Sequence, residues 1–303
     1  MARTTPITSG APGSGSIRAI LLMLVALALF SGLDTSAKWL VTREGIGVAQ
    51  VAWLRFLVQI AYMIGIYFAA RLPTILATTQ PKAQLVRSSL MAGTTVFNFV
   101  ALKYLRLDQT ITIVFMTPLV VAGLAGPLLG EWIGWRRWMA IIVGFLGIIV
   151  AVHPGVAVHP AVLYSLASMA CYAGFMLITR RIAGNDPPFV TLFYSMLVGA
   201  VALAPLAIHE WVTPKTWTAV VLLLGLGVLG GLGHFLFIHA YRLAPASRIA
   251  PFLYTQILTM VLFGYLVFGN VPDIWTLTGA AIVTASGVYL FHRERVTREK
   301  DSA

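Results

Sequence analysis

Long apolar blocks alternate along the chain with short polar or charged segments. The blocks from Ile17 to Leu33 and from Leu222 to Ile238 are typical. About twenty consecutive apolar residues are needed for a helix to cross the hydrocarbon core of a bilayer, so each block predicts a membrane-spanning helix. Strands of a membrane barrel would instead alternate apolar with polar residues. The pattern therefore favours helices.

Proline, glycine and charged residues divide these blocks into ten predicted spans with short connections. The predicted spans are 17–40, 48–70, 84–105, 108–129, 136–152, 160–182, 188–208, 216–241, 247–268 and 274–292. Helices satisfy all their backbone hydrogen bonds internally, as lipid requires. The expected fold class is an all-α integral membrane protein with ten transmembrane helices.

The chain also matches itself. At a shift of 139 residues, Ala101-Leu102-Lys103 falls on Ala240-Tyr241-Arg242, and Leu128-Leu129-Gly130-Glu131 falls on Val267-Phe268-Gly269-Asn270; at a shift of 142, Phe30-Ser31-Gly32 falls on Tyr172-Ala173-Gly174. These matches predict two five-helix repeats, 17–152 and 160–292, between a disordered cytoplasmic tail at 1–16 and a basic cytoplasmic tail at 293–303. Because five is odd, the second repeat enters the membrane from the opposite face, which gives inverted topology.

Composition agrees with a lipid environment. Of 303 residues, 59% are hydrophobic and only 10% are charged, whereas a soluble domain has about a quarter of its residues charged. The net charge of +11 comes from basic residues that stand singly or in pairs between apolar blocks, so nucleic-acid binding is not expected. Fifteen Lys and Arg residues lie on the predicted side of the two termini and five on the other side. The positive-inside rule then places both termini in the cytoplasm.

Four polar residues in the first three spans are candidates for substrate binding. Asp34 and Lys38 lie one helical turn apart, so they form either a substrate-handling or proton-linked pair, or a salt bridge with Lys38 reaching the interface. Arg55 either neutralises Asp34 or binds a carboxylate of the substrate through its planar guanidinium. Asn98 either contacts a ligand or joins two helices by hydrogen bonds.

The second half supplies further candidates. Ser168 and Tyr172 lie on one face of the sixth span, and Tyr254 and Gln256 lie in the ninth span at the level of Thr112 to Thr117 in the fourth. Polar groups at matching depth around a pseudo-two-fold axis suit a central cavity, although aromatic residues at helical spacing also simply pack. His234 is a candidate proton relay or a buried packing residue. With Cys171 as the lone cysteine, neither a disulfide within the chain nor a metal site of the CxxC type is possible, and we expect no metal or cofactor.

Together with the ten duplicated spans, three motifs give the chain a family resemblance. The aromatic-Ser/Ala-Gly signal in the first helix of each half, Trp53-Leu54-Arg55-Phe56 and Leu128-Leu129-Gly130-Glu131 resemble the EamA-type branch of the drug/metabolite transporter superfamily. The resemblance implies export of amino acids or other metabolites from a bacterial cytoplasm across the inner membrane. The second half departs from the first, with Asn270 in place of Glu131 and Ser195 or its neighbours in place of Arg55.

The expected function is therefore secondary transport by alternating access, with small polar metabolites, and first of all amino acids, as the exported substrate. The alternatives are an exporter or uniporter of a nucleobase, a sugar derivative or an amphipathic cation, and a channel. An enzyme is not expected because the chain has no HExxH or GxSxG motif and no close carboxylate pair in a span. The expected partners are a small-molecule substrate, the lipid bilayer and protons as a coupling ion, and the expected assembly is a monomer or a weak homodimer.

Overall fold

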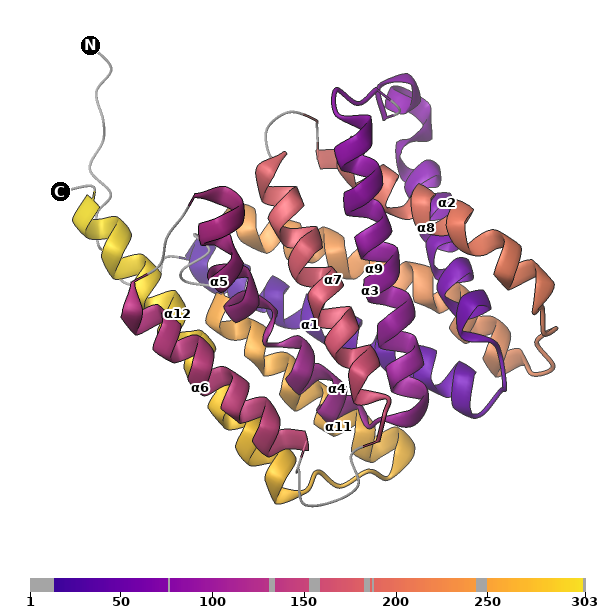
Figure 1. Cartoon of the computed structure of the whole chain (residues 1–303). Helices are drawn as coiled ribbons and strands as arrows, with labels where there is room; N and C mark the ends of the chain where they lie inside the picture. Colours follow the sequence, from indigo (N-terminus) through magenta and orange to yellow (C-terminus); the bar gives the residue numbers. More distant parts are fainter. Residues whose placement is uncertain are drawn as a thin grey trace, which may run out of the picture.

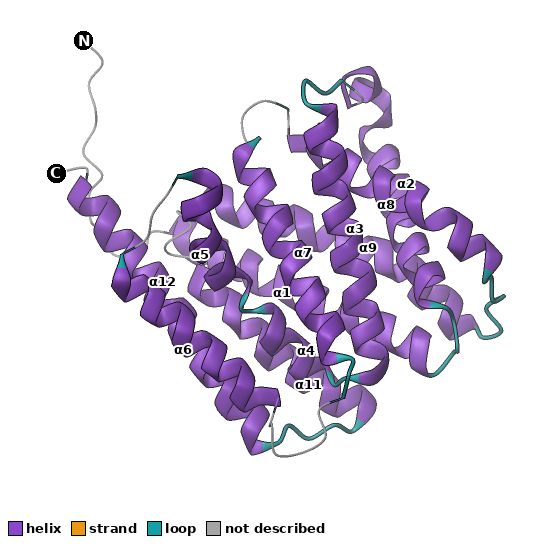
Figure 2. Ribbon diagram, in the orientation of Figure 1, coloured by secondary structure: helices purple, strands orange, loops and turns teal. Residues whose placement is uncertain are grey.

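A computed structural model describes residues 14–75, 77–130, 134–152, 159–182, 186, 188–243 and 250–301, and across these ranges the chain is helical with no strand (Figure 2). The helices are α1 (Ser14–Thr42), α2 (Val48–Ile75), α3 (Pro81–Tyr104), α4 (Leu107–Val114), α5 (Thr117–Leu129), α6 (Trp135–Val152), α7 (Val162–Arg181), α8 (Pro188–His209), α9 (Trp217–Leu243), the 3₁₀ helix η1 (Ala250–Thr255), α11 (Gln256–Phe268) and α12 (Ile274–Asp301).

Seven helical segments of the described chain are long and apolar enough to cross a membrane. They coincide with the predicted first four spans and with the sixth, seventh and eighth. Three shorter apolar segments, at Trp138–Ala151, Phe252–Phe268 and Ile274–Tyr289, coincide with the predicted fifth, ninth and tenth spans. The all-helical membrane fold is confirmed, whereas the count of ten spans stays a prediction.

The first and last helices extend beyond the predicted boundaries between the spans and the two tails. α1 already begins at Ser14, inside the predicted tail, and residues 1–13 lie outside the described residues. At the other end α12 continues to Asp301, past the predicted span end at 292. The apolar block marks where a span leaves the lipid, but Arg, Glu and Lys are good helix formers and let the helix continue.

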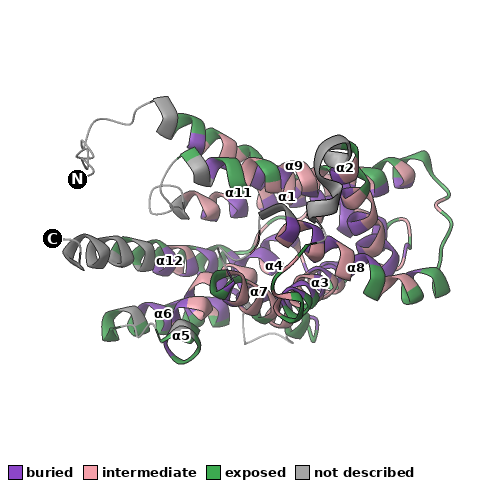
Figure 3. Cartoon of the chain, turned by 90° about the horizontal axis from the view of Figure 1, so that it is seen from above, coloured by how far each residue is buried: buried purple, intermediate pink, exposed green. Residues whose placement is uncertain are grey.

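Large apolar side chains cover the outside of the bundle. Trp135 and Trp217, at the first residues of α6 and α9, are 71% and 78% exposed, and Ile17, Leu21 and Val25 form an exposed apolar stripe on α1. Exposed residues, green in Figure 3, lie on the outward sides of the helices, and buried residues lie where helices meet. Such a surface suits lipid, with tryptophans at helix ends near the headgroups. The protein is a multi-pass membrane protein.

Helices far apart in the sequence pack in pairs. α1 packs along α9, and α3 packs along α7. α6 and α12 run side by side at one edge of the bundle, and α2 and α8 pack together at the opposite edge (Figure 1). Every one of these pairs joins a helix before residue 153 to a helix after residue 159, so the two predicted repeats are interleaved rather than side by side.

The predicted fourth and ninth spans are each interrupted near the middle. The first part, α4, ends at Val114 and α5 begins at Thr117. Pro118 has no backbone N–H to donate to the Val114 carbonyl, and the Thr117 hydroxyl donates to that carbonyl instead. In the ninth span the interruption is the change from η1 to α11 between Thr255 and Gln256.

The two interruptions meet in the core. The rings of Phe115 and Tyr254 lie edge to face with 5.2 Å between centroids, and these residues are 139 positions apart. Gly130 and Gly269, also 139 apart, follow the last residues of α5 and α11 with φ of 74° and 69°. This left-handed conformation favours glycine. The shift found in the sequence thus relates equivalent local structures.

Candidate functional site

A group of polar side chains lies where α1, α2, α3 and α9 meet, and we call Asp34, Arg55, Thr95, Asn98 and His234 the Asp34–Arg55 cluster. Helix α1 contributes Asp34, α2 contributes Arg55, α3 contributes Thr95 and Asn98, and α9 contributes His234. Polar groups within a membrane bundle are costly unless they face partners or a cavity. Their convergence from four helices makes this cluster the candidate substrate site.

Arg55 is the best-buried charge of the cluster, with 7% of the residue exposed. Its Nη1 donates a 2.6 Å hydrogen bond to the Thr95 hydroxyl, and its guanidinium carbon lies 5.5 Å and 5.9 Å from the ring centroids of Phe56 and Phe99. Nε is buried and donates to no described residue. One edge of the guanidinium is therefore free to bind an anionic group.

Asp34 lies beside Arg55 without forming an ion pair. The Asn98 amide donates to Asp34 Oδ1 over 3.1 Å. The Arg55 charge is near enough to act on Asp34 electrostatically, yet among the described residues no nitrogen of Arg55 approaches an Asp34 oxygen within 4.0 Å. The two charges are adjacent, but each keeps unused hydrogen-bonding capacity.

His234 is the member of the cluster that α9 contributes. Its ring lies 4.9 Å from that of Phe30, centroid to centroid, at an interplanar angle of 60°. One turn earlier, Gly230 brings α9 close to α2, since a Cβ at this position would lie 3.3 Å from Gln59 Oε1 and 3.7 Å from Arg55 Nε. The absence of a side chain at Gly230 thus lets α9 pack closely against the Nε side of Arg55.

Lys38 points away from Asp34, although the two residues are one turn apart on α1. Its Nζ donates to the carbonyls of Leu102 and Leu105, at 2.6 Å each, and lies 5.4 Å from the ring centroid of Phe268. The carbonyls at the C-terminus of a helix carry partial negative charge and attract a cation. Lys38 therefore joins α1 to the end of α3, and no Asp34–Lys38 ion pair is found among the described residues.

The candidates from the second half lie at helix contacts of their own. The Ser168 hydroxyl donates to the Thr94 carbonyl over 2.9 Å, which joins α7 to α3. Tyr172 stacks on Phe175 with 6.0 Å between ring centroids. Tyr254 is buried against Phe115 and its hydroxyl has no described hydrogen-bond partner, while Gln256 is 8% exposed. None of the four has a described hydrogen bond to Asp34 or Arg55.

A second polar network, which the sequence did not indicate, lies near the start of α3. Arg87 is 4% exposed and donates to Thr179 on α7 and to Thr191 and Ser195 on α8. The sequence places Arg87 at the cytoplasmic end of the predicted span 84–105, where a single arginine is typical of a span end. Its burial depends on α7 and α8, about a hundred residues later in the chain.

Asp186, in the connection from α7 to α8, extends this network. It accepts hydrogen bonds from the hydroxyls of Thr78 and Thr79, the Thr79 backbone N–H and the Gln84 amide. Partial desolvation raises the pKa of the Asp186 carboxyl, but these hydrogen bonds outweigh it and hold the pKa below its ordinary value.

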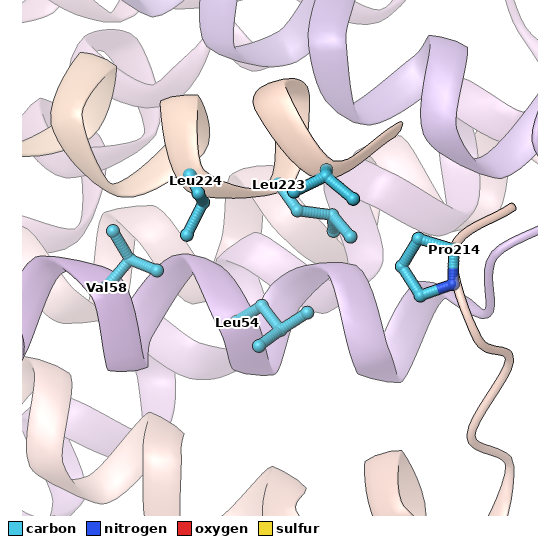
Figure 4. A pocket seen from close by; sticks show the side chains of 6 residues that line it. Leu54, Val58, Pro214, Leu223 and Leu224 are labelled. Carbon is cyan, nitrogen blue, oxygen red and sulfur yellow. The ribbon is translucent and has the colours of Figure 1, made fainter. Parts of the chain in front are cut away.

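An apolar pocket lies between α2 and α9. Leu54, Val58, Pro214, Val220, Leu223 and Leu224 line it (Figure 4). A polar substrate needs at least a few oriented polar groups in its site, and this lining offers none. The pocket is therefore not the substrate site. Among the described residues, no group of three or more His, Cys, Asp or Glu side chains could hold a metal ion.

Comparison with known proteins gives matches over nearly the whole chain. The family described as "EamA-like transporter family" matches residues 17–153 and 159–291. The S-adenosylmethionine uptake transporter of Rickettsia bellii is 29% identical, over 91% of this chain and 94% of its own. The riboflavin transporter of Vibrio cholerae is 26% identical over 95% and 98%, and the pseudopaline exporter of Pseudomonas aeruginosa is 24% identical over 88% and 95%.

A solved crystal structure shares the fold at a TM-score of 0.63 and 18% identity, and the match covers 90% of this chain and 96% of that one.

Proposed function

The chain belongs to the EamA-like transporter family and is a metabolite transporter, and we propose that its substrate is a zwitterion of the S-adenosylmethionine type, carried by alternating access. The observation that carries this proposal is the unpaired proximity of Asp34 and Arg55 in the bundle core. A zwitterion presents a carboxylate and a cationic group a few bonds apart, so it complements an acid and a base that do not neutralise each other directly.

The two charges have distinct roles in this proposal. The substrate carboxylate binds at the free Nε edge of Arg55, because a planar guanidinium binds a carboxylate through two parallel hydrogen bonds. Asp34, held by Asn98, faces the ammonium or sulfonium cation. The rings of Phe30 and His234, which lie against each other, supply aromatic surface beside this pair.

The choice of S-adenosylmethionine follows from the relatives. Their printed names include S-adenosylmethionine, riboflavin and pseudopaline, and free amino acids, our first expectation from the sequence, gain no support from them. S-adenosylmethionine keeps the amino-acid group that suits Asp34 and Arg55 and adds a cationic sulfonium. Riboflavin has no zwitterionic group and would leave both charges unpaired.

The architecture that we propose for the carrier is the inverted five-helix repeat. Three observations support it: the interleaved packing of α1 with α9 and α3 with α7, the contact between Phe115 and Tyr254, and the matching left-handed glycines Gly130 and Gly269. In such a repeat, exchange of the conformations of the two halves opens the central site to alternate faces of the membrane.

Orientation, direction and coupling complete the proposal. The bias of Lys and Arg supports cytoplasmic termini in the bacterial inner membrane. The names of the relatives include both uptake and export, so we keep the direction of net flux as a quantity to measure. Protons, with Asp34 and His234 as the titrating groups, are the proposed coupling ion, and the proposed assembly is a monomer or weak homodimer.

Counterflow in proteoliposomes tests the substrate. Vesicles loaded with unlabelled S-adenosylmethionine should accumulate the radiolabelled compound transiently, whereas vesicles loaded with leucine or riboflavin should not. Accumulation driven only by riboflavin would disprove the proposed substrate class. Repeating the assay with an imposed pH gradient of either sign tests proton coupling, because a uniporter would be indifferent to the gradient.

Two variants test the assigned site. Arg55→Gln should raise KM for S-adenosylmethionine by roughly tenfold or more, since charged hydrogen bonds contribute about 1.5–3 kcal/mol. Asp34→Asn should lower the affinity for cationic substrates while the Asn98 contact is kept. Lys103→Gln is the control. Lys103 is exposed and lies outside the cluster, so this change of one charge should leave KM unchanged.

A further inference from the structure

Arg87 is a buried cation without a counter-ion among the described residues. Its acceptors are the Thr179 hydroxyl at 2.6 Å, the Thr191 carbonyl at 3.0 Å and the Ser195 hydroxyl at 2.8 Å, all of them neutral. Nη2 donates to no described residue, and the ion pairs of the described chain involve Arg106 alone. A buried charge that is hydrogen-bonded but not neutralised favours binding of an oppositely charged group.

The nearest acid of the network does not neutralise Arg87. Asp186 is reached only through Gln84, whose amide donates to Asp186 at 2.9 Å and to the Thr191 hydroxyl at 3.1 Å. Asp186 itself is already bound by Thr78 and Thr79. The carboxylate is therefore committed to the connection between α2 and α3, and the charge of Arg87 stays available.

Aromatic rings extend from Arg87 along α7. The guanidinium carbon lies 4.4 Å from the ring centroid of Phe175, which is the closest of the described contacts between an arginine and a ring. Phe175 in turn stacks on Tyr172 at an interplanar angle of 13°. A planar group with an oxyanion attached could thus contact the rings and the guanidinium together.

We propose that Arg87, with Phe175 and Tyr172, forms a second anion-binding site near the end of the bundle where α3 begins, distinct from the Asp34–Arg55 cluster. Its ligand is an oxyanion: either the substrate carboxylate, before or after it occupies Arg55, or the phosphate of a lipid headgroup. The first source rests on the proposed transport function. The second does not, because lipid binding at Arg87 would be independent of what the protein carries.

The position of this site corresponds to that of Arg55 in the other half of the proposed repeat. Ser195, which accepts from Arg87, lies in α8 near the position that aligns with Arg55 in α2. The second half thus lacks an arginine on its own second helix, but α3 of the first half places a guanidinium there. Arg55 and Arg87, both from the first half, thus place a buried guanidinium near the second helix of each half.

The first arm of the test uses the substrate carboxylate. Counterflow of S-adenosylmethionine and of its decarboxylated analogue is measured for wild type, Arg87→Gln and Arg87→Lys. If the carboxylate binds at Arg87, Arg87→Gln raises KM for S-adenosylmethionine by roughly tenfold, with a much smaller change for the analogue, and Arg87→Lys lies between. A purely structural arginine would affect both compounds equally.

The second arm does not depend on transport. The melting temperature of the purified protein in a neutral detergent is measured with added phosphatidylglycerol, phosphatidylcholine or inorganic phosphate. Binding of a headgroup phosphate predicts that phosphatidylglycerol raises the Tm of wild type more than phosphatidylcholine does, and that Arg87→Gln removes this difference. Should wild type fail to transport S-adenosylmethionine, the proposed function fails and this arm still decides the site.

A third variant guards against loss of folding in Arg87→Gln. Ser195→Asp places a carboxylate beside Nη1, so it should raise Tm without any added anion and abolish the response to phosphatidylglycerol, whereas Ser195→Asn should do neither. The proposal is overturned if wild type and Arg87→Gln respond alike to the carboxylate, to phosphatidylglycerol and to phosphate, or if Ser195→Asp lowers Tm as much as Ser195→Asn.

Discussion

Lys38 offers a direct test of how the helices are held together. Its ammonium is buried, with 8% of the residue exposed, and it donates 2.6 Å hydrogen bonds to the Leu102 and Leu105 carbonyls at the end of α3. Lys38→Met keeps the length of the side chain and its apolar stem but removes the charge and both donors. We expect α1 to separate more easily from α3 in this variant.

The magnitude follows from the two bonds. Each hydrogen bond to a charged group contributes roughly 1.5–3 kcal/mol net, so two contribute about 3–6 kcal/mol. Methionine no longer has the desolvation cost of a buried ammonium, which offsets part of the loss. The carbonyls, however, lose their donor in an apolar setting. Lys38→Met should therefore lower the free energy of unfolding by roughly 3 kcal/mol.

Reversible unfolding in mixed micelles, followed by tryptophan fluorescence, measures this loss. Lys103→Met is the matched control, since Lys103 lies on the same end of α3 but is exposed and only approaches the Tyr104 ring, at 5.5 Å. The control should change stability by no more than about 0.5 kcal/mol. Equal effects of the two substitutions would refute the reasoning, because the buried bonds would then contribute nothing beyond an exposed lysine.

Two further predictions concern packing and pH. Gly279→Leu should destabilise the bundle by about 1–3 kcal/mol or more, since a Cβ there would lie 2.5 Å from the Gly147 carbonyl oxygen across the α6–α12 contact. Gly225→Leu is the control, because a Cβ at Gly225 would have no atom within 4 Å. The Tm of each variant measures the effect. Because folding lowers the pKa of Asp186, its contribution should be full above about pH 4 and be lost as pH falls below that value, and Asp186→Asn should remove this pH dependence of Tm.

Apolar block length and composition were sufficient to predict a helical membrane bundle. Where the structure differs, the cause is local backbone chemistry. A hydropathy block does not register a missing N–H, so hydropathy alone predicts one continuous span where the chain is interrupted between α4 and α5, next to Pro118. The contact of Phe115 with Tyr254 could be anticipated only in part: the repeat shift aligned the two positions but did not say that they touch.

The candidate site was predicted less completely, because its partners come from distant helices. Helical spacing put Asp34 and Lys38 on one face, yet Lys38 is long enough to reach α3, where two carbonyls bind it. Of the two alternatives for Arg55, neutralisation of Asp34 by an ion pair is not found among the described residues, and binding of a substrate carboxylate stays a prediction. Arg87 was missed because its acceptors on α7 and α8 are unrelated to it in spacing.

In the proposed inverted repeat, two identical halves would give two end states of equal energy, because exchange of their conformations would convert one state into the other. The two halves of this chain differ in sequence, so the two states need not be equal in energy. Lys38 joins α1 to the end of α3 at one face, and Asp186 joins the α7–α8 connection to the segment before α3 at the other. A ligand or variant shifts a two-state equilibrium only through contacts that differ between the states, so we expect substitutions at Lys38 and Asp186 to change which face is open at rest.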